Sequence, residues 1–126
     1  MTNYYDSSIL ETKTNGDVFI DLECGFGQPS VTTIYLKKTD GTLGKLGSYD
    51  NNINNEKIGS IESLKYGIIE IHTTINDIVD NEEERQDISL KIKVNETESN
   101  FVGTGFTKDT TGKGSIFHSF YTVTII

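Results

Sequence analysis

The strongest constraint on the fold is a strict alternation of apolar and polar residues near the middle of the chain. Every second residue of segment 88–94 (ISLKIKV) is aliphatic, and the residues between them are serine or lysine. A period of two places the aliphatic side chains on one face of a strand and the polar ones on the other. Segment 66–75 (YGIIEIHTTI) alternates in the same way, with Ile69, Ile71 and Ile75 in its inner set. We therefore expect the two segments to be neighbouring antiparallel strands at the centre of an all-β domain.

Two dipeptides predict tight hairpin turns elsewhere in the chain. Asn15-Gly16 lies between the predicted strands Ser8–Lys13 and Asp17–Glu23, and Asp40-Gly41 lies between two further strand segments. Asn-Gly and Asp-Gly are typical of type I′ turns, because both central residues of such a turn need a positive φ. Each dipeptide therefore predicts a pair of antiparallel neighbours.

The longer connections are predicted from composition. Segment Cys24–Ser30 contains two glycines and the only proline, which favours a corner in the chain or a crossing from one sheet to another. Segment Tyr49–Ser60 contains four asparagines and is expected to be a polar loop, pinned to the core by Ile53 and Ile58. Segment Ser115–Ile126 alternates again and ends in isoleucine, so we expect a last strand that is docked in a sheet or held by a partner.

These segments together predict the architecture. A chain of 126 residues is long enough for one domain with its own core. Many short strand segments and the lack of a long amphipathic pattern favour an antiparallel two-sheet β-sandwich of about eight strands. We expect residues 1–126 to form this single domain, with an up-and-down β-barrel as the alternative.

Charge and cysteine content narrow the classes of partner and compartment. The net charge is −8, from 19 acidic and 11 basic residues, which disfavours nucleic acids and anionic membranes and favours cationic partners. The single cysteine excludes an intrachain disulfide, and no signal sequence or membrane-spanning apolar run is seen. We expect a cytoplasmic protein, with export without a cleaved signal as the alternative. The abundance of asparagine, isoleucine, lysine and threonine indicates an AT-rich bacterial genome.

Two sets of residues contain potential metal ligands. Clustered carboxylates in segment 77–87 supply the oxygen ligands that Ca²⁺ prefers, although the spacing of an EF-hand loop is absent. The weak calcium candidates are Asp77, Asp80, Glu82 and Glu84. His72, His118 and Cys24 are the only nitrogen or sulfur donors, and their spacing matches no zinc motif. We expect solvated turns, and neither a metal nor another cofactor.

Catalysis is not expected either. Cys24 lies in a glycine-rich segment and a cysteine–histidine–aspartate arrangement is formally available, but no signature of a nucleophile surrounds it. An isolated cysteine usually behaves as a small buried apolar residue.

Aromatic residues give the clearest functional lead. Six of them do not all fit one inner face of a sheet: Tyr4, Tyr5, Phe19, Phe26, Tyr49 and Phe120. Aromatic side chains that gather on an outer face usually mark a surface for a partner. We therefore expect a non-enzymatic module for protein–protein interaction or assembly, acting on a protein partner or by self-association, with Phe19, Tyr49 and Phe120 as candidate interaction residues. The alternative is a loop-rim ligand-binding module for calcium or carbohydrate.

Overall fold

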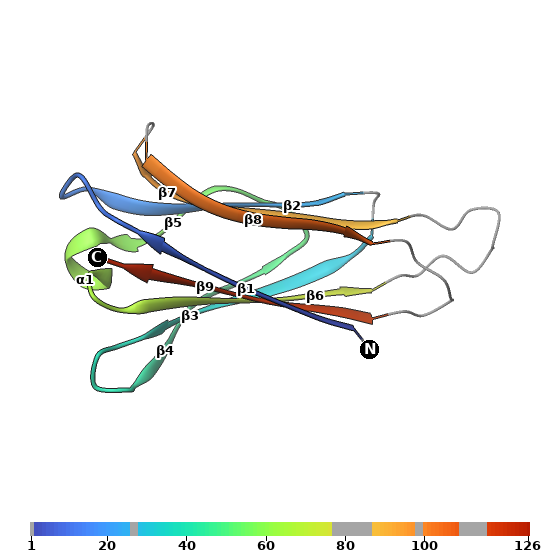
Figure 1. The fold of residues 1–126 in the computed structure, drawn as a ribbon, viewed down its shortest axis with the longest axis horizontal. Helices are drawn as coiled ribbons and strands as arrows, with labels where there is room; N and C mark the ends of the chain where they lie inside the picture. Colours follow the sequence, from blue (N-terminus) through green and yellow to red (C-terminus); the bar gives the residue numbers. More distant parts are fainter. Residues whose placement is uncertain (1, 26–27, 77–86, 98–99, 109–115) are drawn as a thin grey trace.

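The protein is a two-sheet β-sandwich in a computed structural model, which describes residues 2–25, 28–76, 87–97, 100–108 and 116–126 (Figure 1). The strand order is β1-β9-β6-β3-β4 in the five-stranded sheet and β5-β2-β7-β8 in the four-stranded sheet. The two sheets pack face to face and do not close into a barrel. The prediction of an all-β sandwich is confirmed, and the barrel alternative is wrong.

The elements have the following bounds. The five-stranded sheet contains β1 (Thr2–Leu10), β9 (Ile116–Ile125), β6 (Ile68–Asn76), β3 (Ser30–Lys37) and β4 (Leu43–Asp50). The four-stranded sheet contains β5 (Ile53–Ser60), β2 (Asp17–Gly25), β7 (Ile88–Thr97) and β8 (Asn100–Lys108). A single helical turn, α1 (Ile61–Leu64), connects β5 to β6.

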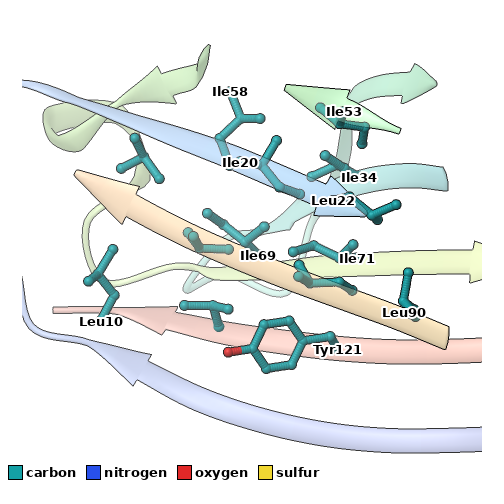
Figure 2. Close-up of a cluster of buried hydrophobic side chains, with 14 of the residues drawn as sticks. Leu10, Ile20, Leu22, Ile34, Ile53, Ile58, Ile69, Ile71, Leu90 and Tyr121 are labelled. Carbon is teal, nitrogen blue, oxygen red and sulfur yellow. The ribbon is translucent and has the colours of Figure 1, made fainter. Parts of the chain in front are cut away.

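One apolar core lies between the sheets and consists mainly of isoleucine and leucine (Figure 2). The alternation that predicts β7 is confirmed, because Leu90 and Ile92 are only 1% and 2% exposed. Tyr121 is fully buried, and its hydroxyl donates a hydrogen bond to Ser8 Oγ at 2.7 Å. Its polar atom is thereby satisfied, as burial of a phenol requires.

The predicted pairing of the two central segments is wrong. They form β6 and β7, which lie in different sheets and face each other across the core. β6 pairs with β3 and β9, whereas β7 pairs with β2 and β8. Alternation shows which face of a strand is buried, but it does not show which other strand supplies the hydrogen-bond partners.

The predicted first hairpin is also wrong. β1 lies in the five-stranded sheet and runs parallel to β9, while β2 belongs to the four-stranded sheet. Neither Asn15 nor Gly16 has the positive φ of a type I′ turn, because the connection crosses between sheets. The prediction of a purely antiparallel sandwich therefore fails at β1. The hairpin at Asp40-Gly41 is confirmed, since it joins β3 to β4, but only Gly41 has a positive φ, of 87°, so its turn is not of type I′.

Of three other predicted segments, two are confirmed and one is wrong. The crossing after Cys24 is confirmed, because β2 and β3 lie in different sheets, and β9 is a docked last strand with Ile125 buried. The polar loop over 49–60 is wrong, since β5 occupies most of it, although Ile53 and Ile58 are buried as expected. Of the four asparagines, only Asn51 and Asn55 have a positive φ. β5 pairs with β2, and the pairing contains register shifts.

Candidate functional site

The outer face of the five-stranded sheet carries a row of rings that crosses four strands. Tyr5 of β1 pairs with Phe120 of β9, and Phe120 pairs with His72 of β6. The ring centroids lie 5.1 Å apart for Tyr5 and Phe120 and 5.3 Å apart for Phe120 and His72. Tyr35 of β3 extends the row, with its ring centroid 5.2 Å from that of His72. These four residues are the aromatic row.

The row is a direct consequence of strand pairing. Alternate residues of a strand point away from the core, so an outward ring on each of several neighbouring strands meets the next ring across the sheet. The rings of Tyr5 and Phe120 are inclined by only 17°, in the stacked range, whereas His72 meets Phe120 edge-on at 71°. Both arrangements are favourable for aromatic pairs at these separations.

Polar side chains contact both His72, which belongs to the row, and His118, which lies beside it. His72 Nε2 lies 3.2 Å from Glu70 Oε1, a contact that is an ion pair only when the imidazole is protonated. His118 Nδ1 lies 3.1 Å from Thr74 Oγ1, and its ring stacks on Phe120 at a centroid distance of 6.1 Å. The row therefore has hydrogen-bonding groups at its margin as well as aromatic area.

Exposed apolar side chains concentrate on this same face. Eight large apolar residues are exposed within the described ranges, and five of them point outward from the five-stranded sheet. These five are Tyr5, Ile9, Val31, Leu43 and Ile116. Tyr5 is the most exposed, at 69%. Soluble proteins seldom leave this much apolar area on one surface unless a partner covers it.

The three predicted interaction residues do not come together. Phe120 belongs to the aromatic row, but Phe19 points outward from the four-stranded sheet, where β2 pairs with β7. Tyr49 packs against the core between the sheets. Of the other aromatics, Tyr4 turns inward and its ring lies 4.6 Å from that of Phe106, while Phe26 is outside the described residues.

Sequence reasoning missed Tyr35 and His72 as members of the row. Both residues stand at outward positions of the alternation, and in the β3–β6 pair Tyr35 lies opposite Glu70 and His72 lies opposite Thr33. The signal that could have found them is an aromatic or imidazole ring at an outward position on several strands. The order of the strands is also needed, and that is not local information.

The remaining predicted sites do not assemble in the described part of the chain. Asp77, Asp80, Glu82 and Glu84 lie outside the described residues, and the described residues contain no group of three or more potential metal ligands. Cys24 is 8% exposed, and its Sγ donates to the carbonyl of Gln28 at 3.4 Å. Both histidines lie on the outer face of the other sheet, so they form no nucleophile–base pair with this thiol.

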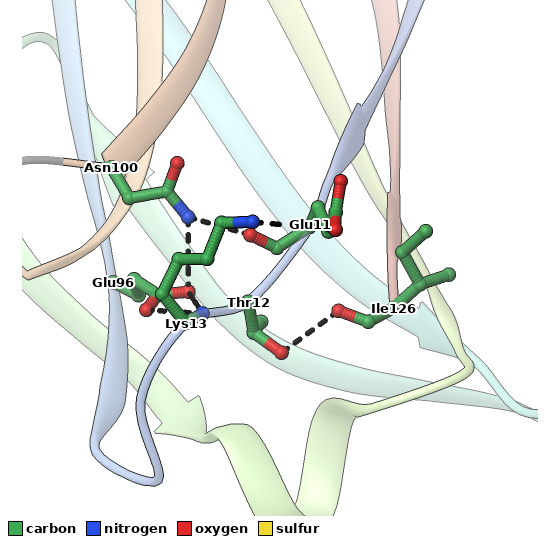
Figure 3. Close-up of polar contacts among 6 residues, drawn as sticks. All are labelled: Glu11, Thr12, Lys13, Glu96, Asn100 and Ile126. Atoms are coloured by element: carbon green, nitrogen blue, oxygen red, sulfur yellow. Dashed lines mark hydrogen bonds and ion pairs between the residues drawn. The ribbon is translucent and has the colours of Figure 1, made fainter.

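A buried carboxylate at one end of the sandwich has a structural role that the sequence did not suggest (Figure 3). Glu96 is 1% exposed, and both of its carboxylate oxygens accept from the N–H of Lys13, at 2.7 and 2.9 Å. Asn100 Nδ2 donates to Glu96 Oε2 at 3.3 Å and to the carbonyl of Glu11 at 2.6 Å. The network connects the segment between β1 and β2 to the β7–β8 hairpin. The Glu96 carboxylate therefore makes its hydrogen bonds within the protein.

Comparison with known proteins adds no functional information. Among the residues that the structure describes, no helix combines the length and the apolar character needed to cross a bilayer. The chain matches no protein-family model, no curated protein and no solved structure.

Proposed function

We propose that the protein is a non-enzymatic module that binds a protein partner through the outer face of its five-stranded sheet. The observation that supports this proposal is the aromatic row, which crosses β1, β9, β6 and β3 and begins at the highly exposed Tyr5. Aromatic side chains are enriched in protein interfaces, where a few of them contribute most of the binding free energy.

The size of this face suits a stable interface. Five strands spaced about 4.8 Å apart, each about nine residues long, give a sheet face of roughly 700 Å². A specific interface of standard size buries about 800 Å² on each partner. The face and its margins therefore match one side of such an interface.

Charge favours a different protein over a second copy as the partner. Each copy has a net charge of −8, so two copies repel one another, whereas a partner with a basic rim is attracted. Self-association through the same face is the alternative that the experiment must distinguish from this proposal.

The test compares two exposed aromatic residues on opposite sheets. Tyr5→Ala removes the exposed end of the aromatic row, and Phe101→Ala removes a ring of similar exposure, 58%, from the outer face of the four-stranded sheet. We expect a protein captured by the wild type to bind the Tyr5 variant at least tenfold more weakly, a loss of about 1.4 kcal/mol, and the Phe101 variant with unchanged affinity.

Two results would contradict the proposal. The first is a partner whose affinity is reduced by Phe101→Ala and not by Tyr5→Ala, which would place the interface on the other sheet. The second is a concentration series in light scattering that shows a dimer of the wild type and a monomer of the Tyr5 variant. That result would assign the face to self-association.

A further inference from the structure

A strained tyrosine lies at the end of the sandwich, away from the aromatic row. Directly after α1 the chain makes a four-residue turn, in which the N–H of Gly67 donates to the carbonyl of Leu64 at 3.0 Å. Lys65 has φ −60° and ψ 135°, and Tyr66 has a φ of 71°. These are the angles of a type II turn, whose third position requires a positive φ and normally holds glycine or asparagine.

Packing accounts for the glycine next to it, but not for the tyrosine. A Cβ atom on Gly67 would lie 2.7 Å from Leu36 Cδ1 and 3.2 Å from the carbonyl oxygens of Leu64 and Lys37, so a side chain at the buried fourth position of the turn would be crowded. Tyr66 is 66% exposed, and its ring contributes little to the core. A bulky residue at positive φ is a true conformational outlier, and such strain tends to persist where a side chain is needed for function.

The strained conformation is fixed by the last strand. The N–H of Tyr66 donates to the carbonyl of Ile125 at 2.6 Å, and the N–H of Ile125 donates to the carbonyl of Gly67 at 3.0 Å. Figure 1 shows α1 beside the end of β9, where this contact is made. The backbone of the turn is therefore held against β9, and the tyrosine side chain is exposed to solvent.

The ring lines a cavity of about 480 Å³ together with Asn15, Ile61, Glu62 and Lys65. Lys65 Nζ lies 5.5 Å from the centroid of the Tyr66 ring. The cavity therefore combines an aromatic ring with a carboxylate, an amine and a primary amide. Its volume lies within the range of small-molecule sites, about 300–1,000 Å³, and such sites pair apolar surface with a few polar groups.

We propose that this cavity binds a neutral saccharide. One face of a sugar ring consists of C–H groups that pack against an aromatic ring, while its hydroxyls both donate and accept hydrogen bonds. Glu62 accepts from hydroxyls, and Lys65 and Asn15 donate to them. The charges of Glu62 and Lys65 cancel, and the net charge of −8 on the protein disfavours an anionic ligand. This site is separate from the proposed interaction face.

The test uses neutral trisaccharides as probes of the full chain. Maltotriose, cellotriose, xylotriose, mannotriose and chitotriose are each titrated to about 10 mM, which detects a dissociation constant near 1 mM. We expect at least one of them to shift the backbone amide resonances of residues 61–67 and of Asn15. Glycine and glutamate, titrated in the same way, test for an amino acid in place of a sugar. Shifts that come only from these amino acids, or no shift of these resonances by any trisaccharide, would overturn the proposal.

The strain makes the key variant informative. Tyr66→Gly removes the ring and also relieves the positive φ, so we expect a thermal midpoint that is unchanged or a few degrees higher, with at least tenfold weaker saccharide binding. Tyr66→Asn, which tolerates the same backbone angles, serves as a second variant if the first one fails to fold. Tyr5→Ala should leave saccharide binding unchanged. Undiminished binding by a folded Tyr66 variant would overturn the proposal.

Discussion

Replacing Glu96 by glutamine should destabilise the fold by about 2–3 kcal/mol, although the two side chains have nearly the same shape. The carboxylate is 1% exposed and accepts from the N–H of Lys13 and from Asn100 Nδ2. Glutamine retains one acceptor oxygen but turns an amide N–H₂ group toward one of these donors. Two donors then face each other at a side chain that is almost fully buried.

The magnitude follows from the type of hydrogen bond. Hydrogen bonds to charged groups contribute about 1.5–3 kcal/mol each, and an unsatisfied buried donor costs about 1–3 kcal/mol. The substitution weakens one such bond and breaks the other, which gives the predicted range. In a domain of 126 residues 1 kcal/mol shifts the thermal midpoint by roughly 3–5 °C, so we expect a fall of roughly 6–15 °C.

The assay is urea unfolding followed by far-ultraviolet circular dichroism, with Glu11→Gln as the matched control. Glu11 pairs with Lys13 Nζ at 3.3 Å, but the side chains are 72% and 60% exposed, and exposed ion pairs contribute only about 0–1 kcal/mol. An equal m-value in all three proteins is required for the comparison. If Glu96→Gln were no more destabilising than the control, the network in Figure 3 would not stabilise the fold as argued.

Two further predictions concern the four-stranded sheet. A Cβ atom on Gly103 would lie 2.7 Å from the carbonyl oxygen of Ile92, so Gly103→Ala should push β8 away from β7 and cost about 1–3 kcal/mol in urea unfolding, and an unchanged midpoint would contradict this. Burial raises the pKa of the Cys24 thiol above its ordinary value. At pH 8 less thiolate is present than in the unfolded chain, so Ellman's reagent should react faster after unfolding in urea, and equal rates would be inconsistent with a buried thiol.

The sequence predicts which side chains enter the core better than it predicts which strands are neighbours. Alternation is local, so the buried positions of β7 were evident from seven consecutive residues. Hydrogen-bond partners are not local. β6 and β7 therefore looked like a pair, although they belong to opposite sheets, and the parallel docking of β1 on β9 left no signal within β1 itself.

The candidate sites could not be predicted for the same reason, because they combine residues that are distant in the sequence. Phe120 was evident as an outward aromatic residue, but its neighbours Tyr5 and His72 come from strands far away in the chain. At the end of the sandwich, Tyr66 has the positive φ, while Leu36 and the carbonyl oxygen of Lys37 lie close to the Cα of Gly67. That contact is visible only in three dimensions.

The parallel docking of β1 on β9 determines when the proposed interaction face can form during synthesis. β1 is synthesised before its partner strand β9, which follows it by more than one hundred residues. Until β9 is made, Tyr5 cannot stack on Phe120, and the five-stranded sheet lacks β9 and the docked β1 at one edge. The proposed binding surface combines strands that are widely separated in the chain, so it can form only after β9 has been translated, and partner binding would therefore report that β9 has docked beside β1.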